Sequence, residues 1–161
     1  MVDITSISAL VAALGVIVGV VFAVLQLRDL VKTRQTDLAI RLYSQVCDKE
    51  HIEAWGKYIT AEYKDYNDFV EKYGPLFSDK PVPVAFMMVS HYFEGIGVLL
   101  HRKLVDIDLV LDIFAIGMLW EKMKPLAEGI RKELDQPSFY EWFEYAYNEM
   151  KKRQQTLQTQ Q

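Results

Sequence analysis

Three side chains able to bind a metal lie in or just after one apolar segment: His91, Glu94 and His101. Helical di-iron sites take Glu-x-x-His from each of two helices and a single glutamate from each of two others. Here the order is reversed, and the only other grouping is His51 with its neighbouring glutamates. We therefore expect no metal site and no cofactor, and we find no catalytic motif that would mark the chain as an enzyme.

The carboxyl group of Glu94 needs another explanation. An isolated charge is costly away from water, so a carboxylate on a buried helix must be paired or protonated. Glu94 lies close in the sequence to Phe93 and Ile96, and Arg131 lies on a later helix with the apolar flanks Leu126 and Ile130. We predict a structural buried pair between Glu94 and Arg131.

The elements that must position these residues begin with a membrane span. From Ile4 to Leu27 the sequence contains no charged residue, and about 20 apolar helical residues cross a bilayer. A cleaved signal peptide fits less well, because such peptides open with basic residues and have an apolar stretch of about 7–15 residues. We predict an uncleaved transmembrane anchor over residues 1–27.

Basic residues follow the apolar run directly: Arg28, Lys32 and Arg34. Lysine and arginine accumulate on the cytoplasmic side of a span, where they also attract anionic lipid headgroups. We predict a single-pass protein of the cell membrane, with its N-terminus outside and its C-terminal domain in the cytoplasm.

Small side chains recur every three or four residues along the span: Ser8, Ala12, Gly15, Gly19 and Ala23. Such a face lets two helix backbones approach closely, and this packing drives helix association in lipid. We predict a parallel homo-oligomer that forms through these five residues, which we call the small-residue ridge. The alternative is a face that meets only lipid.

The rest of the chain has helical spacing in every long segment and no sustained strand-like alternation. We predict an all-α fold, in which the transmembrane helix is followed by a small cytosolic helical bundle over residues 28–153. The segment from Val84 to Leu100 is apolar nearly all round, which is typical of a central buried helix. A second span is the alternative, opposed by the cost of inserting its charged and histidine side chains. Residues 154–161, mostly glutamine and threonine, are predicted to be a disordered tail.

Local signals set the expected helix boundaries. Asp48 can cap a helix, whose apolar face would hold Ile52, Trp55 and Ile59. Pro125 is expected to kink or end a later helix, because proline lacks the backbone donor. Ser138 and Glu141 have the spacing of a capping box at the start of the last helix.

Aromatic residues crowd one stretch between these helices: Tyr58, Tyr63, Tyr66, Phe69, Tyr73 and Phe77. Tyrosine favours interfaces, so these rings are candidates for a ligand groove or for contact with lipid headgroups. The interpretation we favour is that they cover a small core. The single cysteine, Cys47, suits a reducing compartment and is expected to be a small buried residue.

The charge balance excludes one class of partner. The net charge is −4, and residues 42–150 carry eleven basic against nineteen acidic side chains. Nucleic-acid binding needs a basic stripe that displaces counterions from the phosphates. We therefore expect no long nucleic acid as a partner.

Two segments carry a resemblance to a known family: HYFEGIGVLLHRKLVDIDLV and WEKMKPLAEGIRKELDQPSFYEWFEY. The shared features are a Glu94-x-x-Gly97 helix, a turn with Asp106, then Trp120, Pro125, Arg131 and an aromatic last helix. In these features the chain resembles the short membrane-anchored prokaryotic proteins grouped as a domain of unknown function. The resemblance implies an N-terminal span on a helical cytosolic domain, and it carries over no catalytic residue.

From these observations we expect a membrane-anchored interaction or scaffold protein that meets an unknown cytosolic partner or small ligand. The alternative is a ligand-gated oligomeric pore or a membrane-disrupting effector, in which the spans bundle and the cytosolic domain senses a small molecule.

Overall fold

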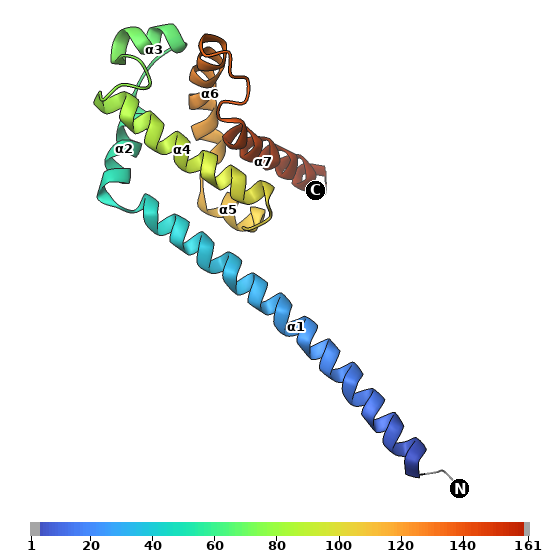
Figure 1. The fold of residues 1–161 in the computed structure, drawn as a ribbon. Coiled ribbons are helices and arrows are strands. Elements are labelled where there is room, and N and C mark those ends of the chain that lie inside the picture. The colour runs from blue at the N-terminus through green and yellow to red at the C-terminus, as the bar shows by residue number, and fades with distance from the viewer. Residues whose placement is uncertain (1–3, 160–161) are drawn as a thin grey trace. The chain divides into compact units, whose positions relative to one another are not determined.

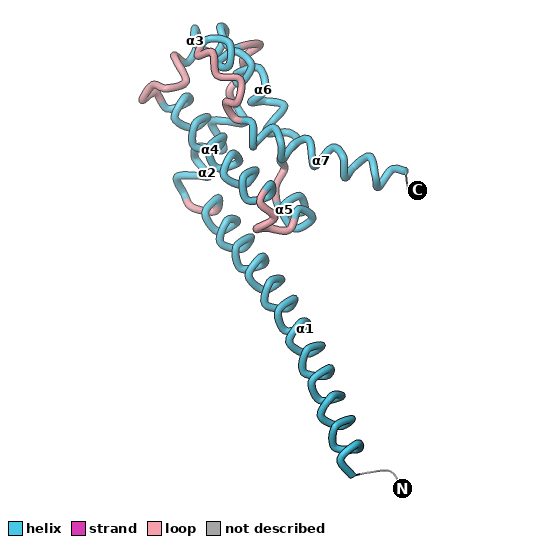
Figure 2. The backbone as a smooth tube through the Cα atoms, turned by 45° about the vertical axis from the view of Figure 1, so that its right-hand side comes forward, coloured by secondary structure: helices cyan, strands magenta, loops and turns pink. Residues whose placement is uncertain are grey.

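The computed structural model describes residues 4–159, and within this range the chain forms helices joined by turns and loops, with no strand (Figures 1 and 2). The all-α prediction is confirmed. The chain divides into two compact units, an N-terminal unit, Met1–Asp37, and a helical unit, Leu38–Gln161.

Helix α1, Ile4–Val46, provides the whole described part of the N-terminal unit and the first residues of the helical unit. Its stretch from Leu10 onward is long and apolar enough to cross a membrane. Within the helical unit, Leu38, Leu42 and Val46 pack against the core, and Ala39 is buried. The residues of α1 from Leu38 onward therefore belong to the compact helical unit.

The helical unit continues with six further helices in its described residues: α2 (Lys49–Thr60), α3 (Tyr66–Tyr73), α4 (Pro81–His101), α5 (Ile107–Ile113), α6 (Ile116–Glu133) and α7 (Glu141–Thr159). Helix α4 is central, since it packs against α2 on one side and α7 on another, while α6 contacts α7 and α3 (Figure 1). Its length and composition also meet the criteria for a span. However, Phe86, Phe93 and Ile96 are fully buried in the protein core, as expected of a central helix.

The buried face of α2 differs from the predicted one. Ala54 and Tyr58 are buried, whereas Ile52 and Ile59 are exposed and Trp55 is only partly covered. Asp48 does precede the helix, but its side chain makes no capping hydrogen bond. The prediction failed because two apolar stripes share this short helix, and only contact with α4 selects the one that is buried.

The helical conformation is interrupted between α5 and α6, and not at Pro125. Phe114 adopts an extended conformation, and its ring lies between Tyr43 and Phe93, at centroid distances of 6.3 and 5.7 Å. Pro125 lies inside the continuous helix α6. The neighbours Met123 and Leu126 are fully buried, so tertiary packing holds the helix together across the missing backbone donor.

Helix α7 extends beyond the predicted end of the folded domain. It runs to Thr159, although residues from Gln154 onward were predicted to be disordered. Arg153 anchors this part, with Nε 2.8 Å from a carboxylate oxygen of Asp108 and Nη1 3.4 Å from one of Asp112. Glutamine is also a good helix former, so the helix continues past the last basic residue.

Candidate functional site

The three histidines each lie beside an aromatic ring. His91 Nδ1 is 2.8 Å from the carbonyl oxygen of Met87, and its ring centroid is 5.5 Å from that of Tyr140. The His101 ring lies 4.5 Å from the Trp142 ring. No group of three or more His, Cys, Asp or Glu side chains in the described part of the chain is arranged to hold a metal ion.

Glu94 binds the N-terminus of α7. The backbone N–H of Phe143 donates to one carboxylate oxygen at 2.8 Å, and that of Trp142 donates to the other at 3.4 Å. The first N–H groups of a helix have no partner inside the helix and favour negative charge. Glu94, on α4, therefore caps α7. The predicted capping box is wrong, because α7 begins at Glu141, whose N–H donates to the Ser138 carbonyl oxygen.

Arg131 reaches α7 from α6 and has partners of its own. Its Nη2 is 2.7 Å from a carboxylate oxygen of Glu144, and its Nε donates to the carbonyl oxygen of Phe139 at 2.9 Å. The predicted pair of Glu94 with Arg131 is therefore wrong. Both side chains are partly rather than fully buried, and each is compensated by the start of α7 rather than by the other.

Gly97 explains how α4 and α7 come so close. A Cβ atom at this position would overlap the backbone carbonyl group of Trp142. Glu94 and Gly97 lie one turn apart on α4. The side chain of Glu94 caps α7, and the absence of a side chain at Gly97 leaves room for the backbone of α7. The Glu-x-x-Gly pattern is thus a docking motif for α7.

The electrostatics of this junction follow from burial. Burial raises the pKa of the Glu94 carboxyl above its ordinary value, and the two backbone N–H donors offset part of the rise. Nearby Glu141 raises this pKa further, whereas His91 lowers it. Tyr140, just before α7, has a φ of 56° and a buried ring, and burial raises its pKa as well.

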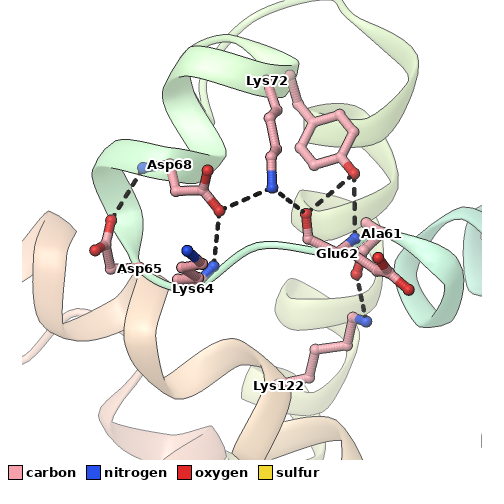
Figure 3. A network of polar contacts seen from close by, with 8 residues as sticks. Ala61, Glu62, Lys64, Asp65, Asp68, Lys72 and Lys122 are labelled. Atoms are coloured by element: carbon pink, nitrogen blue, oxygen red, sulfur yellow. Dashed lines mark hydrogen bonds and ion pairs between the residues drawn. The ribbon is translucent and has the colours of Figure 1, made fainter.

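A polar network fixes the connection between α2 and α3 (Figure 3). Asp68 accepts hydrogen bonds from the backbone N–H of Lys64 at 2.9 Å and from Lys72 Nζ at 3.0 Å. Lys72 also donates to the carbonyl oxygen of Glu62 at 3.2 Å. Asp65 caps α3 by accepting from the backbone N–H of Asp68 at 2.9 Å.

Lys122 extends this network from α6 to the end of α2. Its Nζ donates to the carbonyl oxygen of Ala61 at 2.6 Å (Figure 3) and also to that of Ile59 at 2.6 Å. Burial lowers the pKa of its ammonium group. Since the last carbonyl groups of a helix favour positive charge, Lys122 is a structural tether of the α2 terminus.

The crowded aromatic residues lie mainly in the core, in agreement with the interpretation favoured from the sequence. Tyr58 and Phe69 are fully buried, and three further tyrosines pack against the core: Tyr63, Tyr66 and Tyr73. Only Phe77 departs from this pattern in the set, with 57% of its surface exposed.

The helical unit has an apolar groove that was not predicted from the sequence. It has a volume of about 320 Å³ and is lined by residues of α1, α2 and the α5–α6 joint: Tyr43, Val46, Cys47, Ile52, Trp55, Ile113, Phe114 and Ala115. Cys47 is exposed at this groove, so the prediction of a buried thiol is wrong. The exposed apolar stripe of α2 was the signal that could have revealed the groove.

The residues predicted to act in the membrane all lie on α1. Gly15 and Gly19 have nothing within 4 Å of the position where a Cβ atom would stand, and Ser8, Ala12 and Ala23 lie on the same helix. Arg28, Lys32 and Arg34 are exposed. The structure thus leaves both the ridge and the basic residues accessible to other molecules.

These features define a class of protein, in which an N-terminal helix apolar enough to span a membrane precedes an all-α unit. The model of the family described as Domain of unknown function (DUF4760) matches residues 13–150, and the chain belongs to this family. The match includes most of α1 and nearly all of the helical unit. Comparisons with curated proteins and with solved structures gave no match.

Proposed function

We propose that this protein is an interaction or scaffold protein anchored in the cell membrane. Helix α1 spans the bilayer once with the N-terminus outside, and the helical unit lies at the cytosolic face. The small-residue ridge associates parallel copies, and the helical unit meets a cytosolic partner or small ligand.

The exposure of α1 supports the anchor most strongly. Between Leu10 and Leu27, twelve large apolar side chains are each 45–67% exposed. A soluble protein rarely leaves such a continuous apolar surface uncovered, and a bilayer would bury it without a partner chain. After Asp3 the next charged residue is Arg28, which sets the cytosolic edge of the proposed span.

The apolar groove of the helical unit supports the interaction role. Ile52 is 58% exposed and Tyr43 50% exposed at its edges, and the thiol of Cys47 is accessible there. Apolar concave surfaces with a few polar groups are the usual sites for ligands and partner segments. We assign the expected cytosolic contact to this groove.

The topology is tested with the native thiol. Cys47 is the single cysteine and is exposed, so a membrane-impermeant maleimide is expected to label it only after the cells are permeabilised. As a control, Asp3→Cys in a Cys47→Ser background should react in intact cells. Labelling of Cys47 in intact cells would reverse the proposed orientation.

Self-association is tested by filling the ridge. Gly15→Ile with Gly19→Ile is expected to reduce the cross-linked oligomer to less than about one-tenth, because bulky side chains hold the backbones apart. The measurement is the oxidative disulfide yield in native membranes, from Ala23→Cys in a Cys47→Ser background.

The matched control adds bulk on another face of the same helix, with Ile17→Phe and Val21→Phe. It should leave the disulfide yield unchanged. An unaltered yield after the glycine changes would mean that the ridge faces only lipid, or that the helical unit assembles the protein.

The permeability of the membrane to small ions distinguishes the scaffold from the pore alternative. A scaffold leaves the membrane impermeable to small ions when it is overproduced. Ion leakage that disappears in the Gly15→Ile, Gly19→Ile variant would favour the oligomeric pore instead.

A further inference from the structure

Helix α1 carries a groove at the end of its charge-free stretch. The groove has a volume of about 680 Å³ and lies wholly within the N-terminal unit, where its lining is Val24, Leu25, Leu27, Arg28, Asp29, Val31, Lys32 and Gln35. All of its lining comes from one exposed helix, so the groove is an open depression between side chains at the end of the proposed span.

The lining changes character along the helix. Val24, Leu25 and Leu27 belong to the apolar stretch, and Arg28 and Lys32 follow one turn apart. Long basic side chains at the end of a span keep their charge at the headgroup level while their methylene chains cover apolar surface. This order, apolar and then cationic, matches the order of acyl chain and phosphate in a phospholipid.

The charge of the groove is also complementary to such a lipid. Two cations and the carboxylate of Asp29 give it a net charge of +1, which balances one phosphodiester or one anionic headgroup. The ion pairs found among the described residues include neither Arg28 nor Lys32. Arg34, the third basic residue of this segment, does not line the groove.

We propose that this groove binds an anionic phospholipid of the cytosolic leaflet, with the acyl chain along Val24 and Leu27 and the headgroup phosphate between Arg28 and Lys32. The inference rests on the proposed function, since it needs α1 to span the membrane. It goes further by distinguishing Arg28 and Lys32, which bind one lipid molecule, from Arg34, which only adds to the general attraction.

Binding is tested on the full chain in micelles of an uncharged detergent, titrated with a fluorescent phosphatidylglycerol and with the matching phosphatidylcholine. Arg28→Gln with Lys32→Gln is expected to weaken phosphatidylglycerol binding about 30-fold, at about tenfold per 1.4 kcal/mol and about 1 kcal/mol for each basic residue. Phosphatidylcholine should bind the unaltered chain more weakly than phosphatidylglycerol.

The matched control removes the same charge elsewhere on α1, with Arg34→Gln and Arg41→Gln, and should change the affinity by less than about threefold. Equal losses in the two variants would overturn the site in favour of a diffuse electrostatic attraction. Equal affinity for the two lipids would also overturn it. Failure of the anchor itself is recognised separately, because the unaltered chain would then be released from membranes by alkaline carbonate.

Discussion

Replacement of Gly97 by leucine is expected to destabilise the helical unit by at least about 3 kcal/mol, the upper end of the usual cost of overpacking. A Cβ atom at this position would overlap the carbonyl group of Trp142, and backbone cannot rotate aside as a side chain can. The change therefore separates α7 from α4, the central helix. All three tryptophans, Trp55, Trp120 and Trp142, lie in the helical unit, so their fluorescence reports its denaturant unfolding in the full chain.

Gly95 provides a matched control two residues away on the same helix. Nothing lies within 4 Å of the position of its Cβ atom, and the residue is exposed. Gly95→Leu should leave the stability unchanged or raise it by up to about 1 kcal/mol, because glycine is a poor residue inside a helix. Equal losses for Gly95→Leu and Gly97→Leu would show that the close approach of α7 is not what requires glycine.

Glu94→Ala is expected to cost about 2 kcal/mol, because it leaves the first N–H groups of α7 without their acceptor. Those donors are the backbone N–H groups of Trp142 and Phe143. Glu94→Gln keeps an acceptor oxygen and should stay within about 1 kcal/mol of the unaltered chain. The measurement is again the free energy of unfolding of the full chain in detergent micelles.

The same position has a defined pH dependence. Because burial raises the pKa of Glu94 in the folded state, the folded protein binds a proton more tightly there than the unfolded chain does. The resulting stabilisation is complete below the ordinary glutamate pKa of about 4.3 and is lost as the pH rises through the higher folded value. The stability of the unaltered chain relative to Glu94→Gln should therefore fall with increasing pH. A difference that grows in the opposite direction would contradict the dominance of burial at this carboxyl group.

The Arg131→Ala variant tests whether Arg131 is the partner of Glu94. If Glu94 paired with Arg131, removing the guanidinium would leave the carboxylate uncompensated, and Glu94→Gln would then strongly stabilise the Arg131→Ala background. In the structure Arg131 binds the carboxylate of Glu144 and the carbonyl oxygen of Phe139 instead. We expect the effect of Glu94→Gln to agree within about 0.5 kcal/mol in the two backgrounds.

The sequence by itself determined the features that depend on local composition and period. The charge-free run from Ile4 to Leu27 identifies α1 as a helix apolar enough to span a membrane, because length and hydrophobicity alone set that property. Helical spacing without strand-like alternation determined the all-α class, and the nearly uniform apolar surface of Val84 to Leu100 identified the central helix.

Other features were decided only by the tertiary structure. The partner of Glu94 lies 48 and 49 residues further along the chain, at the start of a helix. Sequence reasoning correctly required compensation for this carboxyl group but assigned it to Arg131, a cation with apolar flanks on another helix, because backbone N–H groups leave no signature in the sequence. Tertiary packing also decided three other features: the interruption of the helix at Phe114, the continuity of α6 through Pro125 and the exposed stripe of α2. Periodicity shows which faces of a helix are apolar, but only contact with a neighbouring helix decides which of them is buried and which lines a groove.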